Sequence, residues 1–207
     1  MSDHYVTTPP GDKLDTELLL ISGANVDRQR IESCVPWKKV VGLLTRPATT
    51  TTYTAADAMT DTGGAATPFT VGRFNGARGR IHSVKLLCEV NQALKLQAEM
   101  YLFDGTAAPT AVADNAAFAL SDADLANIIG VVQFDGPTAA ETFVTNAGAG
   151  VAGNAVIVGK MDNDRSKSLP FQCGAATTLI WALFLVRNAY IPLSSEVFRP
   201  VLGIEQN

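Results

Sequence analysis

IHSVKLLCEVNQALKLQAEMYLF, residues 81–103, is the stretch of sequence that decides the fold. Its apolar residues recur at every second position on both sides of Asn91-Gln92, at Val84, Leu86, Cys88 and Val90 and then at Leu94, Leu96, Ala98, Met100 and Leu102. A period of two is typical of a half-buried β-strand. We therefore expect one long antiparallel hairpin that turns at Asn91-Gln92. An isolated hairpin is marginally stable in water, so its apolar face must pack on a second layer.

Shorter strands are predicted along the rest of the chain, at residues 40–44, 69–71, 128–134, 142–145, 155–158, 169–173, 177–186 and 196–204. Segment 177–186 is apolar on both faces, which predicts a central strand covered on both sides. Pro200 lacks an N–H, so the last strand is expected at a sheet edge or at a bulge. Ser121 is expected to cap one short helical turn. The whole pattern predicts an all-β protein, an antiparallel β-sandwich whose expected topology is a jelly roll.

Residues 1–36 differ in composition from the rest of the chain, and they predict an N-terminal extended arm ahead of a sandwich domain at 37–207. A segment of this size is too small to fold alone. Its apolar residues must therefore be covered, either by the protein's own body or by a neighbouring chain. The candidate partner contacts are the apolar residues of the arm and the tryptophan at the entry to the body: Leu18, Leu19, Leu20, Ile21 and Trp37.

The net charge of −4 and the weak clustering of basic residues argue against a nucleic-acid partner. The strongest basic group is Arg73, Arg78 and Arg80, beside the turn signal Asn75-Gly76. We interpret these arginines as solvated turn charges, with an acidic protein partner as the alternative. No apolar run is long enough to span a bilayer and the N-terminus lacks the pattern of a signal peptide, so we expect no membrane partner.

Two stretches imitate ligand-binding motifs without completing them. Residues 148–153 match G-x-G-x-x-G, but a dinucleotide site needs a helix after that motif, and residues 155–158 have the pattern of a strand. Asp162-Asn163-Asp164 begins like a calcium loop, but Lys167 replaces the turn glycine and Cys173 replaces the bidentate glutamate. We interpret this segment as a polar loop, with a weak surface ion site as the alternative.

Catalytic and metal-binding residue types do not group in the sequence. His4 and His82 are the only histidines, which leaves no basis for a triad or a metal cluster, and His82 is expected to be a half-exposed strand residue. The cysteines are Cys34, Cys88 and Cys173, and their odd number and wide spacing argue against a disulfide framework or a zinc site. Cys88 is expected to be a small buried hydrophobe. We therefore expect no catalytic residue, metal or cofactor, and we favour binding or assembly over an enzyme.

The order of blocks in the body carries a family resemblance. The blocks are LTRP at 44–47, TYTAAD at 52–57, GRI at 79–81, LFD at 102–104, PTAVADNAAF at 109–118, DAD at 122–124 and IG at 129–130. In this order, from residue 41 to about 204, the chain resembles virion proteins of tailed bacteriophages that are called capsid decoration, cement or head-associated proteins.

This resemblance implies a jelly-roll β-sandwich that docks on assembled major capsid protein as a homo-oligomer such as a trimer. Such a protein is made in the host cytoplasm and ends on the capsid surface of the virion. A cement protein stabilises the shell by mass action, because it binds the assembled shell and not its separated subunits. The arm is expected to gain order on contact with the shell.

Two alternatives stay open. The first is a carbohydrate-binding β-sandwich, or another phage structural role in the neck, tail or fibre; a carbohydrate site would need a patch of exposed aromatic residues. The candidates for that patch are Tyr53, Phe74, Tyr101 and Tyr190. The second is a hydrolase, which would need two carboxylates at a catalytic distance in a cleft.

Overall fold

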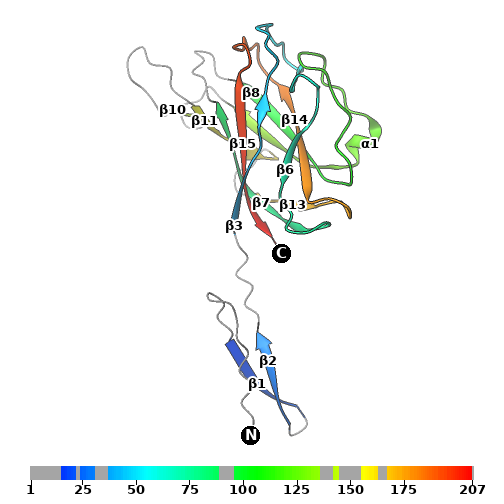
Figure 1. Ribbon diagram of the computed structural model, residues 1–207. Coiled ribbons are helices and arrows are strands. Elements are labelled where there is room, and N and C mark those ends of the chain that lie inside the picture. Colours follow the sequence, from blue (N-terminus) through cyan, green and yellow to red (C-terminus); the bar gives the residue numbers. More distant parts are fainter. Residues whose placement is uncertain are drawn as a thin grey trace. The chain divides into compact units, whose positions relative to one another are not determined.

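The computed structural model describes residues 15–21, 24–30, 37–88, 96–135, 142–144, 155–162 and 167–206. The chain forms two compact units, Met1–Val35 and Pro36–Asn207. In the first unit, β1 (Asp15–Ile21) pairs with β2 (Ala24–Arg30) as an antiparallel hairpin (Figure 1). Four of the candidate partner contacts, at residues 18–21, lie on β1.

The second unit consists of a seven-stranded and a six-stranded sheet. The seven-stranded sheet holds β3 (Trp37–Val41), β4 (Leu44–Thr45), β7 (Arg78–Cys88), β10 (Thr142–Val144), β11 (Ala155–Val158), β13 (Leu169–Gln172) and β15 (Val197–Gln206). The six-stranded sheet holds β5 (Ala58–Met59), β6 (Thr67–Thr70), β8 (Gln97–Phe103), β9 (Ile128–Asp135), β12 (Lys160–Met161) and β14 (Leu179–Val186). One short helix, α1 (Asp122–Leu125), precedes β9.

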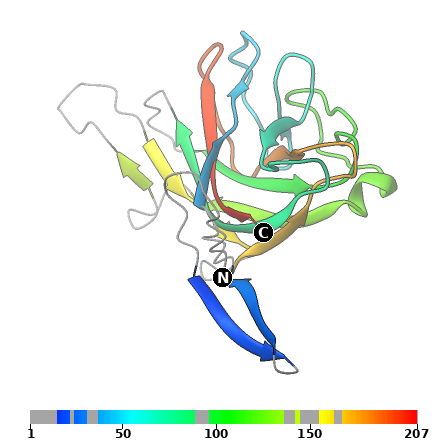
Figure 2. The same cartoon turned by 60° about the horizontal axis from the view of Figure 1, so that its bottom comes forward.

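The two sheets face each other across one core, which confirms the predicted all-β, antiparallel sandwich (Figure 2). The strand order is β10-β11-β7-β15-β3 in one sheet, with β13 beside β7 and β4 beside β15. In the other sheet it is β12-β9-β8-β14-β5, with β6 beside β14. The jelly-roll topology stays a prediction.

The predicted hairpin at residues 81–103 is wrong, although both of its strands exist. β7 pairs with β11, β13 and β15, whereas β8 pairs with β9 and β14 in the opposite sheet. Leu86 on β7 and Met100 on β8 are both fully buried in the shared core. Two strands that face each other across a core show the same alternation as two strands of a hairpin, so the period identifies the buried face and not the hydrogen-bonded neighbour.

The central strand predicted at 177–186 is confirmed as β14, which lies between β8 and the short strands β5 and β6. Its inner face, with Ile180 and Phe184, packs in the main core. Its outer face, with Trp181 and Leu183, packs in a second cluster together with Val112. That cluster is completed by the segment between β8 and β9, which includes α1 and covers the outer face of the six-stranded sheet (Figure 1).

Of the two alternatives for the strand that holds Pro200, the sheet edge is wrong, because β15 lies inside the sheet, between β7 and the pair β3 and β4. The strand does contain an irregularity, a register shift between Gly203 and Ile204. The sheet accommodates the proline through a gap in the neighbouring strand. The N–H of Gly42 donates to the carbonyl of Pro200 over 2.9 Å, and Pro200 has no N–H to return the bond. β3 accordingly ends at Val41 and β4 begins at Leu44.

The predicted cap at Ser121 is confirmed. Its hydroxyl oxygen accepts a hydrogen bond from the backbone N–H of Asp124 over 3.2 Å, which satisfies a free donor of the first turn of α1. The same hydroxyl donates to the Asp124 carboxylate over 2.6 Å. This bond, with help from Thr110, holds the pKa of Asp124 below its usual value. Ser121 and Asp124 thus join α1 to Thr110 within the segment between β8 and β9.

Candidate docking face

The strand β3 presents an apolar stripe to solvent. Its inner residue Val40 is buried, whereas Trp37 and Val41 are 68% and 47% exposed, and Leu43 just beyond the strand is 54% exposed. Alternation along a strand sends every second side chain to the same face. The exposed apolar side chains of this segment therefore lie in one row on the outer face of the seven-stranded sheet.

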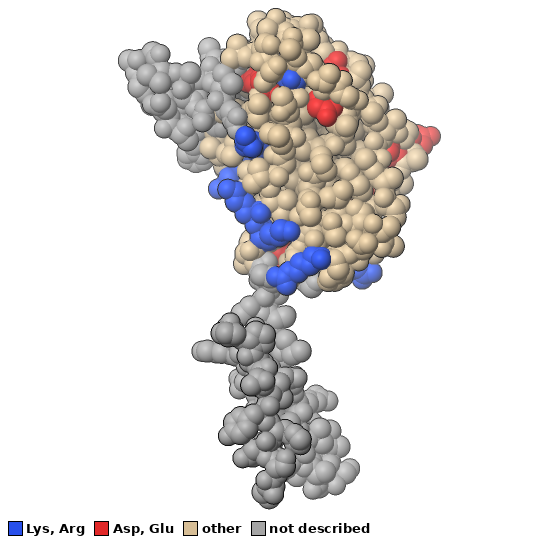
Figure 3. Space-filling model, in the orientation of Figure 1, with Lys and Arg blue, Asp and Glu red and all other residues tan. Residues whose placement is uncertain are grey.

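Basic side chains accompany this stripe, and one of them, Lys39, lies in the same row between Trp37 and Val41. The exposed or half-exposed positions of β3, β7 and β15 on the outer face include five cations: Lys39, Arg78, Arg80, Lys85 and Arg199. Lysine and arginine side chains lie along the side of the body where β3 and β15 run (Figure 3). We call this outer surface of β3, β7 and β15 the basic face. The charge of the basic face is positive, whereas the net charge of the whole chain is −4. Basic and acidic side chains are therefore unevenly distributed.

Among the described residues of β3, β7 and β15, Glu205 carries the carboxylate, and this carboxylate has a partner on the same face. Its Oε2 lies 2.6 Å from Nε2 of His82, which confirms His82 as a half-exposed strand residue. The Trp37 ring packs against the His82 ring, with 4.8 Å between their centroids. The predicted contact Trp37 thus stands at one end of the basic face, held by neighbouring strands while much of its surface stays open to solvent.

A hollow of about 390 Å³ lies in the middle of the basic face, and we call it the groove. It is lined by residues of four strands: Lys39, Ser83, Lys85, Leu87, Val156, Val201, Leu202 and Gly203. The Ser83 hydroxyl lies close over Gly203, and a Cβ at this position would overlap that oxygen. The groove therefore combines an aliphatic floor with two lysines at its margin.

Sequence reasoning missed the basic face because its members come from strands far apart in the chain. Arg78 and Arg80, interpreted above as turn charges, lie on β7, and only Arg73 lies at the turn. Strict alternation along β7 would place Arg78 and Arg80 on the face opposite Lys85, and the three share the outer face only because the register with β15 shifts between Gly203 and Ile204. The contribution of Lys39 depends on the pairing of β3 with β15, which no local pattern reveals.

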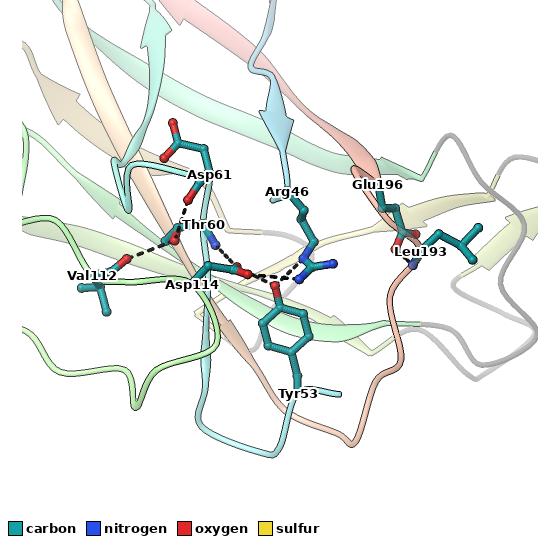
Figure 4. A network of polar contacts seen from close by, with 8 residues as sticks. All are labelled: Arg46, Tyr53, Thr60, Asp61, Val112, Asp114, Leu193 and Glu196. Carbon is teal, nitrogen blue, oxygen red and sulfur yellow. Dashed lines mark hydrogen bonds and ion pairs between the residues drawn. The ribbon is translucent and has the colours of Figure 1, made fainter. Parts of the chain in front are cut away.

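A second polar cluster, centred on Asp114, lies among loops near the start of β15, whereas Trp37 lies beside the end of that strand (Figure 4). One oxygen of Asp114 lies 3.1 Å from an Arg46 nitrogen, and the other accepts hydrogen bonds from the Tyr53 hydroxyl over 2.5 Å and from the Thr60 N–H over 3.0 Å. Arg46 also donates to the Tyr53 oxygen. Because Arg46 is only 1% exposed, this cluster is buried, and it connects loops that are far apart in the sequence. We call Arg46, Tyr53, Thr60 and Asp114 the buried clamp.

Tyr190 forms a similar buried contact beside it. Its hydroxyl donates to the Glu196 carboxylate over 2.6 Å, and the same carboxylate accepts from the backbone N–H of Leu193 over 3.2 Å. Burial raises the pKa of Tyr190 far above its usual value, and the Glu196 charge adds to that shift. Burial and the bond to Asp114 raise the pKa of Tyr53 in the same direction.

These raised pKa values predict alkaline destabilisation. Tyr53 and Tyr190 stay protonated in the folded protein above pH 10, while the unfolded chain releases both protons. Their contribution is therefore complete below the unfolded pKa and is lost as the pH rises, at about 1.4 kcal/mol per pH unit for each group. Urea unfolding between pH 8 and 11 checks the slope. Phenolate absorbance from these two residues should rise only together with unfolding, and an earlier rise would contradict the assignment.

The aromatic residues proposed for carbohydrate binding do not form a surface patch. Tyr53 and Tyr190 are buried, which corrects that prediction. Tyr101 is half-buried against Phe118, with ring centroids 5.0 Å apart, and donates to Glu99 over 3.1 Å. Phe74 is exposed. The presence of these aromatic residues in the sequence does not distinguish an exposed ring from a buried one.

The remaining motif-like stretches form no metal-binding site within the part of the chain that the structure describes. Asp162 accepts a hydrogen bond from the N–H of Val131 over 3.1 Å, and residues 148–153 and 163–166 lie outside the described residues. Cys88 is buried in the core, as expected, and Cys34 lies outside the described residues. Among those residues, no three histidine, cysteine or carboxylate side chains gather as a metal site would require. No helix in the described ranges could cross a membrane.

Comparisons of the chain with protein-family models, with curated proteins and with solved structures gave no match. The resemblance to decoration proteins therefore stays an expectation. The basic face, with its apolar stripe and groove, is the surface best suited to bind a partner.

Proposed function

We propose that this chain is a virion structural protein, not an enzyme, that decorates or cements the capsid of a tailed phage by binding assembled major capsid protein. It is made in the host cytoplasm and acts on the capsid surface. The observation that carries the proposal is the apolar stripe of Trp37, Val41 and Leu43 on a basic face of the sandwich. The block order of the sequence supplies the identity of the partner.

The chemistry of the stripe favours binding to a protein surface. Removing apolar surface from water gains about 25 cal/mol per Å², from which the entropic cost of association is subtracted. Tryptophan is enriched among the few residues that dominate the energy of an interface, and apolar residues in a row are less common on a surface than scattered ones. The basic side chains around the stripe accelerate association with an acidic surface and fix its orientation.

The arm supports the same role. An isolated two-stranded hairpin such as β1 with β2 is marginal in water, so contact with a shell would stabilise it. The four apolar residues on β1, at 18–21, remain candidate contacts beside Trp37. A homo-oligomer would present several such contacts at once, and linked contacts multiply a weak affinity. The protein would then bind the assembled shell and raise its stability by mass action.

Cosedimentation with shells assembled from the major capsid protein tests this function. We expect the full chain to pellet with shells and to leave unassembled subunits unbound. Trp37→Ala should weaken shell binding by about 2 kcal/mol, roughly 30-fold, because it removes the exposed ring at the end of the stripe. Circular dichroism checks that the variant is folded.

Phe74→Ala is the matched control, since it removes another exposed aromatic ring, from the turn between β6 and β7 and not from the stripe. It should bind shells as the unchanged chain does. Failure of the unchanged chain to bind shells, or equal losses in the two variants, would contradict the proposal.

A further inference from the structure

We infer that the groove binds an extended acidic and apolar segment of the partner protein, with the pattern acid-x-apolar-x-acid. The two carboxylates meet Lys39 and Lys85, and the apolar side chain between them lies over Val201 and Gly203. The inference rests on the proposed function for the identity of the partner, and its experiment separates the two.

The strand registers place the two lysines on opposite sides of the floor. Lys39 on β3 is opposite Gly203 on β15, and Lys85 on β7 is opposite Val201 on β15. Gly203 and Val201 are two residues apart on one strand, so they share a face. The floor of the groove is therefore bounded diagonally by one lysine from each neighbouring strand.

The spacing of the lysines fits an extended peptide. They are two strands apart, about 10 Å, and two residues apart along the strands, about 7 Å, which gives about 12 Å between their backbones. In an extended chain, residues i and i+4 point to the same side and lie about 13 Å apart, with residue i+2 between them. Two acids at i and i+4 thus reach the two lysines while residue i+2 faces the floor.

The charge of the face selects the sign of the partner. Lys39, Arg78, Arg80 and Lys85 lie on outer positions of β3 and β7, and the carboxylate of Glu205 on β15 lies beside His82. Summed positive charge draws acidic groups to the face and repels basic ones.

The lining of the groove favours a protein over a nucleic acid. Single-stranded nucleic acids bind by stacking their bases on aromatic rings, whereas the side chains that line this groove are aliphatic, hydroxyl or lysine. An aliphatic floor of Leu87, Val156 and Val201 instead suits a leucine or valine side chain of a peptide.

The probe is a capped synthetic peptide, Gly-Glu-Ser-Leu-Ser-Glu-Gly, added to the full-length protein labelled with ¹⁵N. We expect saturable changes in the amide signals of Lys39, Lys85 and Gly203, with an affinity that falls at least threefold between 50 and 500 mM NaCl. The same peptide with lysine in place of glutamate should cause no saturable change. Absence of change with the acidic peptide, or equal change with the basic one, would overturn the inference. Tighter binding of a twelve-nucleotide single strand at the same signals would also overturn it, in favour of nucleic acid.

Paired variants connect the groove to the shell. Lys39→Glu with Lys85→Glu should weaken cosedimentation at least tenfold, whereas Arg73→Glu with Arg187→Glu, the same charge change at exposed positions outside β3, β7 and β15, should alter it less than threefold. Unchanged shell binding by the groove variant would overturn the inference while the proposed function stands. Specific peptide binding by a protein that ignores shells would leave the inference standing and reject the proposed function.

Discussion

Asp114→Ala is expected to lower the free energy of unfolding by about 3–5 kcal/mol. The substitution leaves Arg46, whose side chain is fully buried, without its counter-charge. It also removes the acceptor for the Tyr53 hydroxyl and for the Thr60 N–H, and each unsatisfied buried donor adds its own desolvation cost. Urea unfolding at pH 7 measures the loss.

Asp122→Ala is the control, because Asp122 is an exposed aspartate in the first turn of α1. Its removal should change stability by about 0.5 kcal/mol or less. Asp114→Asn keeps an acceptor at the centre of the clamp and should lose less than the alanine variant. If Asp114→Ala is no worse than the control, the cluster does not stabilise the loops as described.

Phe184→Ala is expected to cost about 3–5 kcal/mol. The ring is fully buried on the inner face of β14, where the strand pairs with Met100 of β8 on one side and with Met59 of β5 on the other. Packed neighbours on both sides limit how far the cavity can collapse, so the loss should lie near the upper part of that range. The midpoint and slope of urea unfolding give the value.

Phe74→Ala serves as the reference for this change, since the same ring is removed from an exposed position. We expect it to alter stability by about 0.5 kcal/mol or less. A loss below about 1.5 kcal/mol for Phe184→Ala would mean that β14 is not the tightly packed centre of the sandwich.

Local patterns predicted the strands well and their neighbours poorly. The two-residue period located the buried faces of β7 and β8, and the two-sided apolar run located β14, because burial acts on each side chain separately. The pairing of β7 with β15 joins residues more than a hundred positions apart, and no short-range signal encodes it. The prediction of a sheet edge at Pro200 failed for the same reason, because the gap that accommodates the proline lies between β3 and β4.

Only one residue of the candidate docking face was predictable from the sequence. Trp37 stood out as an apolar residue at the entry to the body, and the structure leaves it exposed. The groove could not be predicted, because Lys39 and Lys85 become neighbours of Gly203 only through the sheet register. The buried clamp was equally hidden, since Arg46 and Asp114 are 68 residues apart and meet through two loops.

The covering segment between β8 and β9 gives the body two unlike sides. It shields the outer surface of the six-stranded sheet, whereas the described residues leave the other sheet open. Under the proposed function, the open sheet would face the shell and the shielded side would face solvent. The exposed run 106–108 belongs to that segment, so a foreign epitope inserted there would be displayed outward on every copy.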